Sequence, residues 1–190
     1  IDGVLLSTAD AIGEPRPSPS GTVFALIAQG AKRLAIGDRV YEYRAGQYLV
    51  ASIDLPVTGH YSDASPSEPA LGFVLVLRPS AIASVLLEAG PAASSRMHPT
   101  AAPPALGVAA AGPDLLDAVI RMLVLLDSPR DRPVLAPMLE REIVWRLLTG
   151  PLGATVRQFG LADSSVTQIS RAVRWITEHQ NVLITGATGT

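Results

Sequence analysis

The amino-acid sequence predicts an α+β protein, in which a small antiparallel β-barrel is followed by a C-terminal helical annex. Residues 22–78 hold short runs of apolar, aromatic and β-branched residues, which are typical of strands. Gly30, Gly37 and Gly46 separate these runs at places where the chain must turn. After residue 113 the apolar residues recur at spacings of three and four, which is the period of an amphipathic helix.

The composition limits the classes of protein to which the chain can belong. With 190 residues, of which 48% are hydrophobic and 17% charged, it can bury a substantial core or hide part of its surface in an oligomer. The net charge of −2 argues against a free-standing nucleic-acid binder, which normally has a basic face. The chain has no cysteine, so disulfides and thiolate chemistry are excluded.

The sequence also predicts a protein that does not bind a membrane. Its longest strongly apolar stretch, residues 115–126, contains Asp117 and Arg121 and is too short to span a bilayer. The chain begins at Ile1, without a methionine and without a signal-like segment. We therefore expect a cytoplasmic location and a chain that is part of a longer protein.

We expect residues 1–21 to form an N-terminal arm. Pro15, Pro17 and Pro19 alternate with polar residues, and such a segment is extended and is neither a helix nor a central strand. The arm either stays loose in solvent or folds across the mouth of the barrel.

Residues 22–112 are expected to form the barrel. Both faces of the run at residues 48–53 are largely apolar, as expected where one face fills the barrel and helices cover the other. Tight turns are predicted at residues 29–32, 36–39 and 44–47. The last part of this region is predicted to hold a short helix near residues 80–89, an Ala/Pro-rich loop at 90–105 and a short strand at 106–110.

Residues 113–162 are expected to form the helical annex. Asp114 can cap a first helix, which stops before Pro129, and a second helix is predicted over residues 133–149. Because only a few residues join them, the two helices should be antiparallel neighbours. Residues 163–190 are expected to hold a linker helix and a tail.

The sequence offers little catalytic chemistry. A metal site in a small barrel needs clustered imidazole and carboxylate ligands, but His60, His98 and His179 are not paired at ligand spacing. The nucleophile-elbow, Walker and dinucleotide motifs are also missing from the sequence. We therefore expect no catalytic residue, no metal and no cofactor, and a strand histidine such as His60 is either a satisfied polar residue or a ligand contact.

Three separated segments resemble the N-terminal region of AraC-type transcription regulators. They read IAQGAKRLAIGDRVYEYRAGQYLVASIDLPVTG, LLDSPRDRPVLAPMLEREIVWRLLTGP and ISRAVRWITEH. The resemblance covers residues 22–179 and implies a cupin-like barrel for sensing an effector, a helical pair for dimerisation, and no enzymatic activity. In that family the helix matching residues 169–179 opens the DNA-binding domain, whereas this sequence continues only as QNVLITGATGT. DNA would then be contacted only through a C-terminal domain that is absent from this chain.

The resemblance directs the choice of candidate residues. We expect a small-molecule effector to contact aromatic or polar groups on the barrel strands, namely Phe24, Tyr48, Ser52, His60 and Phe73. A register shift of one residue would replace several of these. We expect a homodimer through the two annex helices, with candidate interface residues Leu115, Val119, Leu123, Leu135, Leu139 and Ile143.

Two alternatives remain open at this stage. One is a metal-dependent cupin enzyme, such as an isomerase or dioxygenase, and the missing ligand cluster weighs against it. The other is a non-sensing oligomerisation module, whose barrel is simply packed with side chains.

Overall fold

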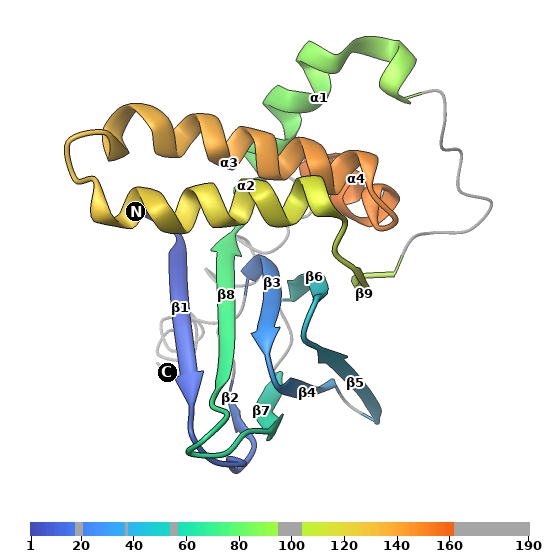
Figure 1. Cartoon of the computed structure of the whole chain (residues 1–190). Coiled ribbons are helices and arrows are strands. Elements are labelled where there is room, and N and C mark those ends of the chain that lie inside the picture. The colour runs from blue at the N-terminus through green and yellow to red at the C-terminus, as the bar shows by residue number, and fades with distance from the viewer. Residues whose placement is uncertain (18–20, 37, 54–56, 95–103, 162–190) are drawn as a thin grey trace, which may run out of the picture.

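The computed structural model describes residues 1–17, 21–36, 38–53, 57–94 and 104–161. In this part of the chain two antiparallel sheets face each other, and the helices lie across one end of the strands (Figure 1). The five-stranded sheet has the order β1 (Val4–Ala9), β8 (Ala70–Val76), β3 (Gly21–Gln29), β6 (Gln47–Ile53) and β9 (Leu106–Ala110). The four-stranded sheet has the order β2 (Arg16–Pro17), β7 (Thr58–Asp63), β4 (Ala31–Ile36) and β5 (Arg39–Arg44).

Helix α1 (Pro79–Ser94) lies between β8 and β9, and the other helices follow β9, which confirms the predicted α+β fold class. The other helices are α2 (Pro113–Val124), the 3₁₀-helix η1 (Leu125–Asp127), α3 (Arg132–Thr149) and α4 (Gly153–Leu161). The predicted antiparallel pairing of the two annex helices is confirmed, because α2 and α3 lie side by side and the short segment around η1 joins them (Figure 1). The helix predicted after residue 163 lies outside the described residues.

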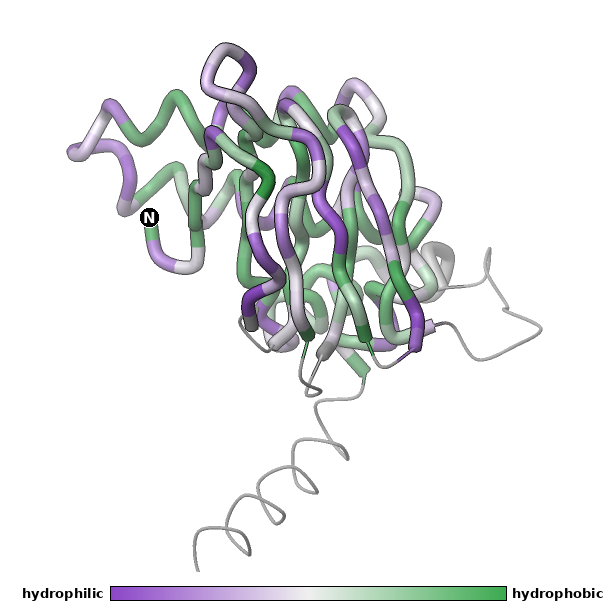
Figure 2. The backbone as a smooth tube through the Cα atoms, turned by 90° about the horizontal axis from the view of Figure 1, so that it is seen from below, coloured by the Kyte–Doolittle hydropathy of each residue, from purple (hydrophilic) through white to green (hydrophobic). Residues whose placement is uncertain are grey.

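Hydrophobic and hydrophilic segments alternate along the strands (Figure 2), and the alternation divides the buried residues between two cores. Along β3, Ala25 and Ile27 face the four-stranded sheet, whereas Phe24 and Leu26 pack in one cluster with residues of the helices. The same division runs along β6 and β8. The prediction that one face of the strands fills the space between the sheets and the other is covered by helices is therefore confirmed.

The prediction that residues 1–21 form an extended arm is partly wrong. Val4–Ala9 forms the edge strand β1, which pairs with β8 along its whole length, and Arg16–Pro17 pairs with β7. Proline is tolerated at such an edge, because an edge strand needs fewer backbone N–H groups for the ladder. The prediction was based on the prolines around residue 17, and it therefore missed the strand at residues 4–9.

Two local predictions around the helices also need correction. Helix α1 continues to Ser94 past a break at Gly90, whose φ is 68°, so the loop predicted from residue 90 begins too early. Asp114 does not cap α2, because the N-cap is Gly112 and Asp114 lies in the first turn. A carboxylate in that turn still interacts favourably with the helix dipole.

The turn at residue 30 requires a glycine, as the sequence predicted. Gly30 has a φ of 80°, and a Cβ at this position would overlap the Asp63 carbonyl oxygen. The turn brings β4 back against β7, and it therefore sets the register of the four-stranded sheet.

Candidate functional site

A cavity of about 490 Å³ opens between the two sheets, at the edge where β1 and β2 lie near β7. Its walls come from the end of β1, the segment that leads to β2, and strands β4 and β7. The lining residues are Thr8, Ala9, Asp10, Gly13, Glu14, Arg16, Lys32, Gly59, His60 and Tyr61. A volume of this size is within the range of roughly 300 to 1,000 Å³ that small-molecule sites occupy.

Lys32 is the basic side chain that points from β4 toward the space between the sheets. It shares a face of β4 with Leu34, which is buried in the inter-sheet core. Its Nζ lies 5.4 Å from the centroid of the Tyr61 ring, a cation–π contact. Burial lowers the pKa of the Lys32 ammonium, and no ion pair within the described residues joins it to a carboxylate. A partly desolvated cation without a counterion is a binding element for an anion.

Tyr61 bridges the two sheets beside Lys32. Its hydroxyl shares a hydrogen bond of 2.5 Å with Ser7 Oγ of β1. A Cβ on Gly72 of β8 would overlap the Tyr61 hydroxyl, so the glycine makes room for this bridge. Strand β5, on the other side of β4, places Tyr43 in the inter-sheet core. Burial raises the pKa of the Tyr43 phenol and keeps it neutral.

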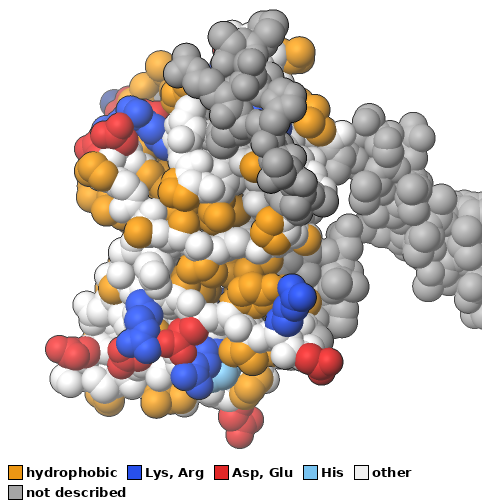
Figure 3. Space-filling model, turned by 90° about the vertical axis from the view of Figure 1, so that its right-hand side faces the viewer, with side chains coloured by type: hydrophobic (Ala, Val, Ile, Leu, Met, Phe, Trp, Pro, Cys, Tyr) orange, Lys and Arg blue, Asp and Glu red, His pale blue; other side chains and the backbone are white. Residues whose placement is uncertain are grey.

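The rim of the cavity is polar, with Asp10, Glu14 and Arg16 exposed to solvent and His60 half-buried. On the face of the molecule seen in Figure 3, basic and acidic side chains lie both at the helical end and at the opposite end. On the outer face of the four-stranded sheet, Glu42 bonds Arg33 at 2.5 Å. Arg33 is therefore neutralised outside the sheet, whereas its neighbour Lys32 faces inward and is not.

The structure places most of the predicted effector contacts on the other face of the five-stranded sheet. Phe24, Tyr48 and Phe73 do come together, with ring centroids 5.6 Å apart for Phe24 and Tyr48 and 6.0 Å apart for Phe24 and Phe73. All three are buried in the core shared with the helices, and Ser52, which accepts a hydrogen bond from Thr22, shares their side of β6. Of the five predicted residues, His60 lines the cavity. The assumed inward face was thus wrong by one residue.

The sequence contains a pattern that could have identified Lys32 as a candidate site residue. In the run Ala31–Ile36, Lys32 alternates with Leu34 and Ile36, so the three share a face that is otherwise apolar. A lysine on such a face indicates a functional position or a buried ion pair. Tyr61, in contrast, could be matched to Lys32 only through the pairing of β4 with β7.

The predicted dimer residues divide by exposure. Leu115, Val119 and Ile143 are buried against the sheet, so their side chains do not face outward as predicted. Leu123 and Leu139 are half-buried, and Leu135 is 42% exposed. Leu135 belongs to an apolar set that lies exposed on the two helices near their connection: Ile120, Val124, Val134, Leu135 and Met138, here called the hairpin patch.

Ion pairs hold α2 against α3 beside this patch. Arg121 bonds Asp117 at 2.8 Å within α2 and Glu142 of α3 at 2.7 Å, and Arg146 of α3 bonds Asp114 at 2.9 Å. The hydrogen bond from Arg121 is the main reason that the pKa of Glu142 is lowered. Exposed pairs of this kind contribute little individually, but together they favour one register of the hairpin.

Two further properties of the described residues bear on the site. No group of three or more histidine, cysteine or acidic residues is arranged to hold a metal ion among them. No described helix has the length and the apolar character needed to cross a bilayer.

The described residues thus form a two-sheet β-domain with a helical annex and an open cavity between the sheets. Comparison with family models gives the family: residues 1–155 match the AraC-type transcriptional regulator N-terminus. The chain belongs to this family, and the resemblance stated from the sequence is confirmed. Because the family is regulatory, the prediction that the chain is not an enzyme is also confirmed, against the alternative of a cupin enzyme.

Two solved structures of ToxT share the fold of this chain at low identity. ToxT from Vibrio cholerae, solved with an unsaturated fatty acid bound, matches with a TM-score of 0.58 at 11% identity, over 94% of this chain and 68% of that one. Apo ToxT K231A from the same organism matches with a TM-score of 0.50 at 9% identity, over 74% of this chain and 54% of that one. The AraC-like activator CuxR is similar at 15% identity and a TM-score of 0.41, over 89% of this chain and 54% of that one. No curated protein matches the chain.

Proposed function

We propose that this chain is the effector-sensing and dimerisation part of an AraC-type regulator, and that the cavity beside Lys32 is its effector site. The observation that carries the proposal is Lys32 itself, a half-buried cation that no carboxylate of the described residues pairs with, at the wall of a cavity of about 490 Å³. Such a regulator acts in the cytoplasm, and DNA is contacted by a domain outside this chain.

The chemistry of the cavity favours a small acid as the effector. A carboxylate near Lys32 would form a charge-assisted hydrogen bond, and the partly desolvated surroundings strengthen such a bond. The Tyr61 ring provides an apolar wall against which the rest of the molecule can pack. That ToxT, which shares the fold, has been solved with an unsaturated fatty acid is consistent with this class of ligand.

The same cavity connects to the helices through the strands. Its wall includes the end of β1, which pairs with β8, and Val76 of β8 donates a backbone hydrogen bond of 2.8 Å to Gly3. Just after β8, Arg78 binds Glu140 of α3. An effector that binds one arrangement of β1 better than another would shift the populations of the helix positions by the same free energy.

Dimerisation is proposed to use the hairpin patch within the annex at residues 113–162. Its five side chains are exposed and apolar and lie on two adjacent helices, whereas a monomer rarely leaves large apolar side chains grouped in this way. The predicted residue Leu135 belongs to this surface, and the half-buried Leu123 and Leu139 would support it.

A second candidate function is a non-sensing oligomerisation module. The observation in its favour is the space between the sheets, where Ile27, Leu34, Tyr43 and Leu49 are buried in one packed cluster. A non-sensing module would not need the open cavity at the edge of that cluster.

The test removes the charge of Lys32 and measures acid binding by titration calorimetry. Decanoate is the probe and decanol its uncharged control. Lys32→Leu should weaken decanoate binding by about 10- to 100-fold, because a hydrogen bond to a charged group contributes roughly 1.5–3 kcal/mol. Arg33→Leu is the matched control, since this neighbouring cation faces outward and is already paired with Glu42.

Two results would refute the sensing proposal. Equal decanoate affinity in wild type and Lys32→Leu would mean that the cavity beside Lys32 is not the site. Failure of acids of several chain lengths to bind at all would favour the oligomerisation module.

A further inference from the structure

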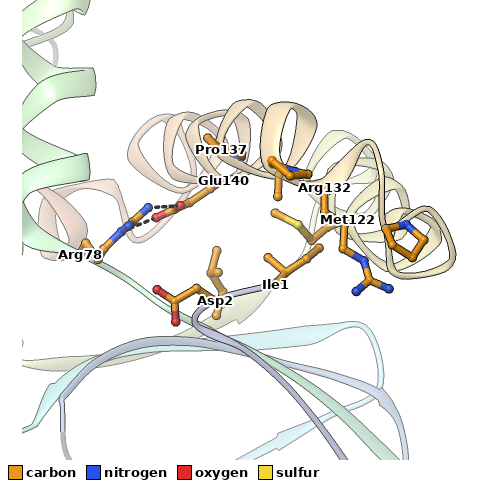
Figure 4. Close-up of a pocket in the computed structure, with 11 residues that line it drawn as sticks. Ile1, Asp2, Arg78, Met122, Arg132, Pro137 and Glu140 are labelled. Carbon is orange, nitrogen blue, oxygen red and sulfur yellow. Dashed lines mark hydrogen bonds and ion pairs between the residues drawn. The ribbon is translucent and has the colours of Figure 1, made fainter.

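A second cavity lies between the α2–α3 hairpin and the adjacent end of the five-stranded sheet (Figure 4). Its volume is about 430 Å³, and it shares no lining residue with the cavity beside Lys32. We propose that this cavity is a second ligand site, which takes a small aromatic carboxylate. The proposal does not depend on the assignment of the effector to Lys32.

The walls of this cavity suit an aromatic ring. Leu75, Met122 and Ala136 are buried and form its apolar interior, and three prolines complete the helical side: Pro129, Pro133 and Pro137. A methionine thioether makes favourable contacts with aromatic rings, and its flexible side chain adapts to the shape of a ligand. The close-up shows Met122 extending from the helices toward Ile1 on the opposite side (Figure 4).

Arg132 provides a cation at one end of the cavity. Its Nε donates to the Leu125 carbonyl at 3.4 Å, and its Nη2 donates to the Leu126 carbonyl. A guanidinium has five N–H donors, so three remain for other acceptors. No ion pair within the described part of the chain involves Arg132. A carboxylate bound here would supply the missing counterion.

The opposite end of the cavity is already neutralised. Arg78 and Glu140 face each other there and form a two-point ion pair, as the dashed lines in Figure 4 show. Asp2 adds a further negative charge beside Arg78. An anionic ligand is therefore oriented with its carboxylate toward Arg132 and its ring over Met122, away from Asp2.

The test uses the protein's methionine methyl groups as reporters. The chain has three methionines, of which Met122 lines the cavity and Met138 is exposed on α3. With ¹³C-methyl methionine, 2-naphthoate should shift the Met122 resonance in a saturable manner, through the ring current of the bound aromatic group, and should leave Met138 nearly unchanged. Met122→Leu assigns the resonance, and 2-naphthamide is the uncharged control probe.

Variants then separate this site from the one beside Lys32. The Lys32→Leu protein should bind 2-naphthoate at the Met122 site with unchanged affinity. Arg132→Leu should weaken that binding at least about 10-fold through loss of the charge-assisted bond, whereas the exposed Arg130→Leu should not. Ala136→Leu, which fills the cavity and keeps Arg132, should abolish binding and guards against a folding defect in Arg132→Leu.

Three outcomes would overturn the second site. They are the absence of a saturable Met122 shift, an equal affinity for 2-naphthoate in wild type and a folded Arg132→Leu protein, and loss of the Met122 shift in Lys32→Leu. The last outcome would assign aromatic acids to the first cavity alone, while failure of the decanoate test would leave the Met122 result untouched.

Discussion

The two faces of the five-stranded sheet differ in how completely they are sealed. On the helix side, Phe24, Tyr48 and Phe73 are buried together, and burial raises the pKa of Tyr48 and keeps it a neutral phenol. On the side facing the second sheet, the core is also apolar at its centre, but its edge opens at Lys32 and Tyr61. The helix-side layer is thus closed around these three rings and opens only at the end of the sheet beside Met122, whereas the inter-sheet layer opens at Lys32.

The largest expected effect is a break in the sealed layer. Phe73→Ala should lower the free energy of unfolding by about 3–5 kcal/mol, because it removes a buried ring and leaves a cavity in the core. Leu71→Ala is the matched control, since Leu71 is two residues away on the same face of β8 but is 40% exposed. Urea denaturation measures both. Similar losses in the two variants would contradict the contrast between sealed and open surface.

The second-largest effect is a loss of dimerisation through the outer side of α2 and α3. Val124→Asp places a charge in the hairpin patch and should raise the dimer dissociation constant at least about 10-fold, as expected for an apolar side chain central to an interface. Leu87→Asp on α1 is the control, because Leu87 is even more exposed but lies outside the patch. Sedimentation velocity measures both variants, and a wild-type chain that stays monomeric at micromolar concentration would refute the proposed dimer.

A smaller effect tests the bridge across the open side. Tyr61→Phe removes the hydroxyl that bonds Ser7 and keeps the ring beside Lys32, so the free energy of unfolding should fall by only about 0.5–1.5 kcal/mol. Tyr41→Phe should change stability less, since the Tyr41 hydroxyl makes no hydrogen bond within the described residues. Thermal and urea denaturation measure the difference, and decanoate affinity should be nearly unchanged in both variants. Equal stability of wild type and Tyr61→Phe would show that the bridge contributes nothing.

The smallest effect is a pH dependence of the helical layer. The hydrogen bond from Arg121 keeps the pKa of Glu142 below its ordinary value, so the ionised carboxylate stabilises the folded state at pH values above about 4.5, the unfolded pKa. This contribution is lost as the pH falls through the lower folded pKa. The difference in melting temperature between wild type and Glu142→Gln should therefore be positive at pH 7 and shrink toward pH 3. A difference that stays constant over this range would exclude the ion pair as its cause.

Much of the architecture could be predicted from local patterns. The glycine at residue 30 requires a positive φ, and the apolar spacing in residues 133–149 is helical, so both turn and helix follow from the sequence. The hairpin of α2 and α3 followed from the short connection between them. Strand β1 escaped prediction, because only its pairing with β8 makes residues 4–9 an edge strand.

The site was harder to predict, because both faces of β3 and β6 are apolar. An alternation of period two identifies the two faces but does not say which of them the helices will cover. The sequence therefore could not decide whether Phe24 or Ala25 faces the space between the sheets. In the structure it is Ala25. The exposed members of the helix stripes were likewise decided by how the hairpin lies on the sheet.

The sequence alone determined the order of the helices and of the strands after residue 21, the resemblance to the family, and the absence of thiol chemistry, because each of these depends on neighbouring residues. Tertiary structure alone decided that Lys32 meets Tyr61, and that Arg132 remains without an acidic partner within the described residues. The physical reason is that a charge acquires its role from the groups that surround it, and pairing between distant strands and helices brings those groups together.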